Sequence, residues 1–320
     1  MRHILRLLAA TLVLVSGIAA AQDWPKKPVR VIVANSAGSL SDLMARLVFA
    51  RVAENLGQAF VIENKPGAGG SIAAAEVARA TPDGYTVLYS SDSQMTINPF
   101  IYKSLGYDPL RDFAPVSLTC KITQALYVNT AVGAKTLDDF VRVARANPDK
   151  FTYASGGNGH ATHLAMELFL WKANLRLVHV PYKGTGPAMQ AAAAGEVSAI
   201  AIAASLAKPF VDQGKLVVLG SIGAPSADVM PGVPPLNRTF PGSEMVSWQA
   251  VLLPAKAPAD IVQALHDAIA KAVGSREVAE RLKDGGTLAM SSSPAELAEL
   301  IHEDYARNGE LAKRMNLKVD

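Results

Sequence analysis

Apolar and polar positions along the first hundred residues follow two alternating periods. Short apolar runs, typical of buried strands, are separated by stretches with the 3.6-residue spacing of amphipathic helices. The expected strands are 29–33, 59–62 and 85–89, and the expected helices are 41–56 and 71–80. Ser41 is expected to cap the first helix, and Gly57 to end it. Alternation of this kind predicts a parallel sheet with right-handed crossovers.

A second series of the same kind follows. Its expected strands are 125–129, 151–154, 177–180, 197–202, 216–219 and 246–253. Its expected helices are 136–146, one ending near 171, 187–194, 259–273, 276–282 and 294–315, while 231–242 is expected to be a loop. We therefore predict an α/β fold with two lobes. Residues 22–123 and 246–320 would form lobe 1, and residues 124–245 lobe 2.

The loops after the expected strands are small and polar. They read AGSLSD, SSDSQ, SGGNGHAT and YKGTGP. Ligands of open α/β sheets bind beyond the carboxyl ends of strands, and helix N-termini there favour anions. The hydroxyl and amide side chains are those of Asn35, Ser36, Ser39, Ser41, Ser91, Ser93, Asn158, Thr162 and Thr185. They indicate a reversible carboxylate site, although the same residues could simply cap helices and fill turns.

The first 21 residues have the layout of a secretory signal peptide. Arg2 and Arg6 precede an apolar core at 7–15, which is shorter than the roughly 20 residues of a membrane-spanning helix. Small residues at 19–21 predict cleavage after Ala21 and export to the periplasm. Removing the two arginines lowers the formal net charge from +3 to +1. With no long Lys/Arg run, nucleic-acid binding is not expected.

Catalytic and cofactor chemistries find little support in the chain. No G-x-S-x-G elbow is present, and Cys120 is the only cysteine. A hydrolase built from distant residues stays a minor alternative. His160, His163 and Glu167 share one helical face and could form a zinc site with His179, but no HExxH motif accompanies them. The glycine-rich GAGGS and GTGP do not have nucleotide-loop spacing. We therefore expect no metal and no cofactor.

Several stretches, taken in order, resemble one known family. They include WPKKPVRVIV, IENKPGAGGSIAAAEVARATPDGYTVL, INPFIYKSLGYDPLRDFAPVSL, YASGGNGHATHLAMELF and VHVPYKGTGPAM. The chain is similar to the substrate-binding receptors of tripartite tricarboxylate transporters, also called Bug-type solute receptors. The resemblance implies a type II periplasmic-binding-protein fold and a non-catalytic role. It implies capture of a small carboxylate, di- or tricarboxylate or aromatic, for a membrane transporter. A sensory partner of a membrane receptor is an alternative, and a monomer is expected.

By position, the resemblance assigns four ligand loops. Their residues are Asn35, Ser36, Ala37, Gly38, Ser39, Ser41 and Asp42; Ser91 and Asp92; Gly157, Asn158, Gly159, His160 and Thr162; and Lys183 and Gly184. The first loop departs from the family form PFPPGGGTD, because Leu40 replaces a glycine. Ile202 stands where relatives often carry an aspartate that can bond an amino or hydroxyl group. Ile202 is included in the predicted site, and it argues against an amino-acid ligand.

Overall fold

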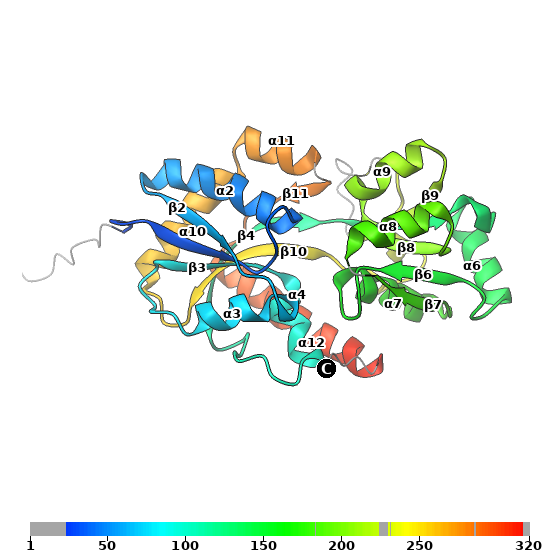
Figure 1. The fold of residues 1–320 in the computed structure, drawn as a ribbon, viewed down its shortest axis with the longest axis horizontal. Helices are drawn as coiled ribbons and strands as arrows, with labels where there is room; N and C mark the ends of the chain where they lie inside the picture. Colours follow the sequence, from blue (N-terminus) through cyan, green and yellow to red (C-terminus); the bar gives the residue numbers. More distant parts are fainter. Residues whose placement is uncertain (1–23, 183, 224–229, 231, 285, 316–320) are drawn as a thin grey trace, which may run out of the picture.

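The protein consists of two lobes, side by side along its longest axis (Figure 1). The structure is a computed structural model that describes residues 24–182, 184–223, 230, 232–284 and 286–315. The predicted signal peptide, 1–21, lies outside the described residues. Within the described ranges, no helix combines the length and the apolar character needed to cross a membrane.

A six-stranded sheet forms the centre of the first lobe, in the order β11-β4-β10-β3-β1-β2. The strands are β1 (Val29–Val33), β2 (Phe60–Asn64), β3 (Thr86–Ser91), β4 (Phe113–Ile122), β10 (Ser247–Pro254) and β11 (Thr287–Ala289). β1 runs parallel to β2 and β3, as predicted, but β10 is antiparallel to β3 and β4. The sheet is therefore mixed rather than wholly parallel, because β10 enters this lobe from the other one.

Helices cover both faces of this sheet. They are α2 (Leu40–Leu56), α3 (Ser71–Ala78), α4 (Asp92–Thr96), α5 (Asn98–Ile101), α10 (Ala259–Val273), α11 (Arg276–Asp284) and α12 (Pro294–Arg314), with the short η1 (Ala68–Gly70). Side chains of β1 alternate between the faces. Val31 and Val33 pack in the core of α2 and α10, whereas Ile32 packs with α3 and α12. Figure 1 shows α2 and α3 on opposite sides of the strands.

The second lobe has a five-stranded sheet in the order β7-β6-β8-β5-β9. The strands are β5 (Gln124–Asn129), β6 (Thr152–Ser155), β7 (Val178–Pro181), β8 (Ala199–Ala203) and β9 (Leu216–Ile222). The helices are α6 (Leu137–Ala146), α7 (Ala161–Ala173), α8 (Thr185–Ala194) and α9 (Ala204–Asp212), with the short η2 (Thr130–Val132) and η3 (Leu236–Arg238). β6 is parallel to β7 and β8, whereas β5 is antiparallel to β8 and β9.

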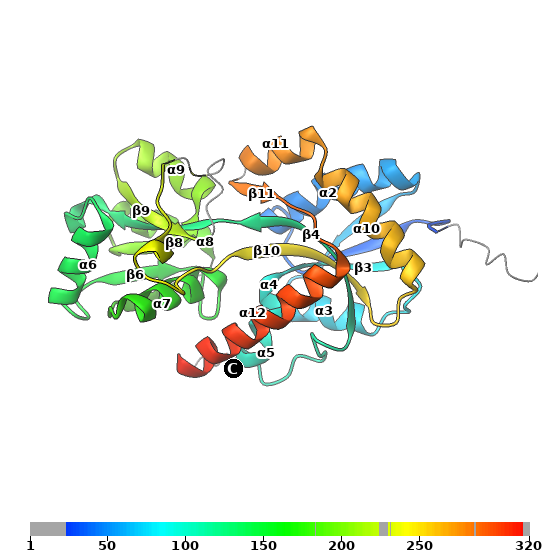
Figure 2. The ribbon, with the colours of Figure 1, turned by 180° about the vertical axis from the view of Figure 1, so that it is seen from behind.

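Two strands and one helix connect the lobes. The chain passes from the first sheet to the second between Ile122 and Gln124, and it returns with β10. The last turns of α12 then reach lobe 2, where Leu311 joins the core that contains Phe169. The guanidinium of Arg314 lies 4.5 Å from the Trp171 ring centroid. Figure 2 shows α12 extending from lobe 1 toward lobe 2.

Candidate ligand-binding site

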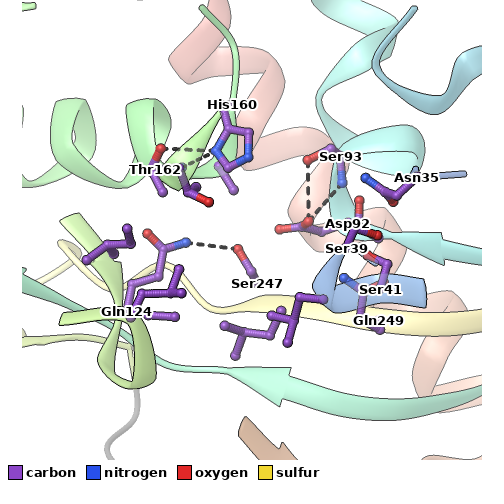
Figure 3. A pocket seen from close by; sticks show the side chains of 18 residues that line it. Asn35, Ser39, Ser41, Asp92, Ser93, Gln124, His160, Thr162, Ser247 and Gln249 are labelled. Atoms are coloured by element: carbon purple, nitrogen blue, oxygen red, sulfur yellow. Dashed lines mark hydrogen bonds between the residues drawn. The ribbon is translucent and has the colours of Figure 1, made fainter. Parts of the chain in front are cut away.

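A cavity of about 230 Å³ lies between the two lobes, where the chain passes from one lobe to the other at β4–β5 and at β10. Figure 3 shows side chains from both lobes pointing into it. Its wall is formed by Asn35, Ser39, Leu40, Ser41, Ser91, Asp92, Ser93, Ile122, Gln124, His160, Ala161, Thr162, Thr185, Ile202, Ala203, Leu206, Ser247 and Gln249.

The N-terminus of α2 contributes one side of the wall. Ser39, rather than the predicted Ser41, is the N-cap, because its backbone is extended and its Oγ accepts a hydrogen bond from the Asp42 amide at 3.2 Å. Ser41 lies inside the first turn. The Asp42 carboxylate accepts from the Gly38 amide at 2.8 Å and pairs with Arg46 at 3.0 Å. Asp42 therefore holds the loop in shape and does not line the cavity.

The pKa of Asp42 reflects this structural role. Burial alone would raise the pKa of the carboxyl group, but the bonds from Gly38, Arg46 and Asn64 hold it below its ordinary value. The side chain is thus an anion that is fully engaged by the protein. A ligand carboxylate at this helix would meet backbone amides and hydroxyl groups rather than the charge of Arg46.

The N-terminus of α7 forms the opposite side. His160 is its N-cap, and the ring Nδ1 accepts from the Thr162 amide at 3.2 Å. The Thr162 hydroxyl lies 3.0 Å from the same nitrogen and accepts from the Gly156 amide. These bonds fix the loop before α7 and aim the start of the helix at the cavity (Figure 3). Helix N-termini carry partial positive charge and unpaired N–H groups, which suit an anion.

His163 and His179 stack on each other next to the loop before α7. His163 Nδ1 accepts from the Gly159 amide at 3.1 Å, and the ring centroids of His163 and His179 are 3.8 Å apart. Ser155 Oγ lies 2.6 Å from His179 Nε2. Burial, together with the neighbouring His179, lowers the pKa of His163 to about 3, and burial lowers the pKa of His179 to about 4. Both rings are therefore neutral near pH 7.

His160, His163, His179 and Glu167 are not arranged as a metal site. Glu167 accepts a hydrogen bond from the Tyr153 hydroxyl, and His160 caps its helix. In the part of the chain that the structure describes, no group of three or more His, Cys, Asp or Glu side chains is placed to hold a metal ion.

The third side of the wall comes from the end of β3 and the short helix α4. The polar run 90–94, predicted as a loop, instead completes the strand and begins this helix. Ser91 is the N-cap, and Gln94 Oε1 accepts from the Ser91 amide at 2.8 Å. Asp92 is only 3% exposed, and its Oδ1 accepts from the Ser93 amide at 2.9 Å. Burial and the nearby Asp304 raise the pKa of Asp92 to about 7.

Residues of the connecting strands form the floor. Gln124 Nε2 donates to Ser247 Oγ at 3.1 Å, and Gln249 lies beside Ser91 in the sheet register. Sequence reasoning missed Ile122, Gln124, Ser247 and Gln249. The available signal was the presence of buried amide and hydroxyl side chains within otherwise apolar strands, which is uncommon unless those groups are hydrogen-bonded or serve a site.

The cavity brings together part of the predicted set. The predicted residues that line it are Asn35, Ser39, Ser41, Ser91, Asp92, Ser93, His160, Thr162, Thr185 and Ile202. The predicted residues outside the wall are Ser36, Ala37, Gly38, Asp42, Gly157, Asn158, Gly159 and Gly184. Gly159, with φ 72°, fixes the shape of the loop before α7, since an added Cβ would lie 2.5 Å from Ile101. Lys183 lies outside the described residues.

The described wall contains neither Lys nor Arg. Its polar groups are hydroxyls, side-chain amides, one imidazole and one carboxyl, and its apolar part includes Leu40, Ile202 and Leu206. Nδ1 of His160 is occupied as a helix cap. Such a wall can hold a small polar molecule through helix N-termini and hydroxyls without an ion pair.

Known proteins resemble this chain over most of its length. A family model described as "Tripartite tricarboxylate transporter family receptor" matches residues 44–317. A UPF0065 protein of Bordetella bronchiseptica is 33% identical over 315 residues, covering 98% of this chain and 93% of its own.

Solved structures also match most of the chain. An R. palustris protein with adipate has a TM-score of 0.81 at 30% identity, over 92% of this chain and 100% of its own. MatC from Rhodopseudomonas palustris with bound malate has a TM-score of 0.76 at 30% identity, over 90% and 99%. The periplasmic binding protein BugD has a TM-score of 0.77 at 26% identity, over 92% of this chain and 100% of its own. These similarities confirm the predicted fold class, that of a two-lobed periplasmic binding protein.

Proposed function

Because this chain belongs to the receptor family of tripartite tricarboxylate transporters, we propose that it captures a small carboxylate between its lobes and delivers it to a membrane transporter. Family members are solute-binding receptors and not enzymes. The ligand classes proposed from the sequence are di- and tricarboxylates and aromatic carboxylates. The relatives with adipate and with malate support a carboxylate for this chain as well.

One observation carries the proposal: two long helices begin at the cavity from opposite lobes. α2 has 17 residues and begins beside Ser39, and α7 has 13 residues and begins beside His160. Their N-terminal amides and partial positive charges favour an anion, and a carboxylate has two oxygens to share between them. An anion bound this way links the lobes, so closing of the cleft follows binding.

The proposal also covers the ligand contacts, the lobe boundaries, export and the oligomeric state. We assign ligand contacts to Asn35, Ser39 and Ser41 in lobe 1, and to His160 and Thr162 in lobe 2. Lobe boundaries at 123/124 and 245/246 are supported by the change of sheet between β4 and β5 and at β10. Export after cleavage at Ala21, a periplasmic location and a monomeric state complete the proposal.

A thermal-shift panel tests the carboxylate function. Succinate, malate, citrate, adipate and benzoate would be compared with their uncharged amides. At about a hundred times the dissociation constant, a true ligand stabilises the folded state by roughly 2.7 kcal/mol and raises the melting temperature. NMR of the same mixtures should show the acid unchanged. Stabilisation by the amides alone, or consumption of the acid, would contradict the proposal.

A further inference from the structure

Asp92 is an unusual residue for the wall of a carboxylate site. It is an acid, it is 3% exposed, and its carboxyl group points into the cavity beside Ser93 (Figure 3). Among the described residues of the wall it is the only acidic side chain, and no Lys or Arg accompanies it. A second carboxylate placed next to it would be repelled, because like charges disfavour each other at short range.

No cation of the described protein neutralises Asp92 directly. Asp304 lies behind it and is already engaged, since it accepts from Trp248 Nε1 at 2.8 Å and pairs with Arg307 at 2.7 Å. Burial and the negative charge of Asp304 accordingly raise the pKa of Asp92 to about 7. The Ser93 amide, the Ser247 hydroxyl and the charge of Arg307 offset only part of this effect on the pKa. A buried carboxylate without a paired cation is unfavourable, and a further donor supplied by a ligand would stabilise it.

Two neighbouring amides also lack hydrogen-bond partners for their oxygens. The side-chain oxygens of Gln124 and Gln249 have none among the described residues, although these side chains are only 3% and 4% exposed. Gln249 pairs with Ser91 in the sheet, next to Asp92, and Gln124 donates to Ser247 on the same floor. Buried polar groups are normally satisfied. These two oxygens and the Asp92 carboxyl group place three acceptors on this side of the wall, whereas the starts of α2 and α7 supply backbone donors.

We propose that Asp92 is a specificity-determining residue that selects carboxylates carrying a hydrogen-bond donor, a hydroxyl or an ammonium group, next to the bound carboxylate. The inference rests on the proposed carboxylate function. The acid group of the ligand lies toward the starts of α2 and α7, and its donor lies toward Asp92. Asp92 supplies the carboxyl group that Ile202 does not provide from lobe 2.

Matched acids test this selectivity. Calorimetric titration would compare succinate, malate and aspartate, which differ only in a 2-hydroxyl or 2-amino group, and adipate with its 2-hydroxy and 2-amino forms. At pH 8, at least one donor-bearing acid in a series should bind about tenfold or more tightly than the plain diacid, as expected for one hydrogen bond to a charged group. Whether the hydroxy or the amino member is preferred identifies the donor.

Asp92→Asn should weaken binding of the preferred acid and strengthen binding of the plain diacid, so the ratio of the two affinities should shrink by about tenfold. Asp138→Asn, at an exposed position of α6, is the matched control and should leave the ratio unchanged. Equal affinities for plain and donor-bearing acids, or an unaltered ratio in Asp92→Asn, would overturn the inference while leaving carboxylate binding intact. If no acid of either series binds at millimolar concentration, this inference fails together with the carboxylate function on which it rests.

Discussion

At the residue scale, Ile202 and Asp92 point to different ligands. The prediction against an amino acid depended on Ile202, an apolar residue where relatives often carry an acid. The structure shows that Asp92 contributes a carboxyl group to the same cavity from the other lobe. A sequence pattern can identify each side chain, but the charge balance of a cavity becomes visible only when its whole wall is assembled.

The stacked pair His163 and His179 makes a prediction about acid stability. Their pKa values, about 3 and about 4 in the folded protein, lie below the ordinary value of 6.5. The unfolded chain therefore takes up protons first, so these groups contribute stability that is complete above pH 6.5 and is lost as the pH falls toward 4. We expect each histidine to lower the free energy of unfolding by about 1–2 kcal/mol between pH 7 and pH 5.

Urea unfolding across this pH range checks the expectation. His179→Gln should be less stable at pH 7 and should show a shallower loss of stability between pH 7 and pH 5 than the wild-type protein. His302→Gln, at an exposed position of α12, serves as the control and should retain the full pH dependence. A His179→Gln variant with the wild-type slope would show that the buried pair does not control acid stability.

At the element scale, the regular α/β pattern was predicted and several shorter or atypical elements were missed. The long helices and most strands follow from apolar periodicity, and helix α10 matches its predicted range (Ala259–Val273). β4 was not predicted, although Val116, Leu118, Cys120 and Ile122 alternate along it and give a strand signal. The short α4 was not predicted either, because a serine-rich run begins this helix through a capping box. Short elements fixed by side-chain bonds leave little periodic signal.

The start of α2 allows a substitution that keeps the helix and changes the site. Aspartate caps a helix as well as serine does, so Ser39→Asp should preserve the fold. The added charge lies in the wall of the cavity, where like-charge repulsion should weaken carboxylate binding by about tenfold or more. Calorimetry with the best acid of the panel measures the change.

Ser293→Asp is the matched control for this experiment. Ser293 caps α12 in the same way, with its Oγ accepting from the Glu296 amide, and it is not part of the cavity wall. This variant should bind the acid like the wild-type protein. Equal affinities of the two variants would move the ligand away from the start of α2.

At the scale of the whole molecule, the site depends on contacts that no local pattern specifies. Gln124 and Ser247 are hydrogen-bonded although 123 positions separate them. Both lie where the chain passes between the lobes, so the floor of the cavity is also the connection about which the lobes would move. The last turns of α12 add a third link through Leu311. The two ligand loops could be predicted because each follows a strand, but this floor could not.

A crystal structure with the tightest-binding acid of the panel would show whether a carboxylate lies between the N-termini of α2 and α7. We predict density in the cavity, with carboxylate oxygens within hydrogen-bonding distance of the first-turn amides of both helices, and with contacts to both lobes. An acid bound instead in the groove beside Trp24 and Pro258, or touching one lobe only, would contradict the account.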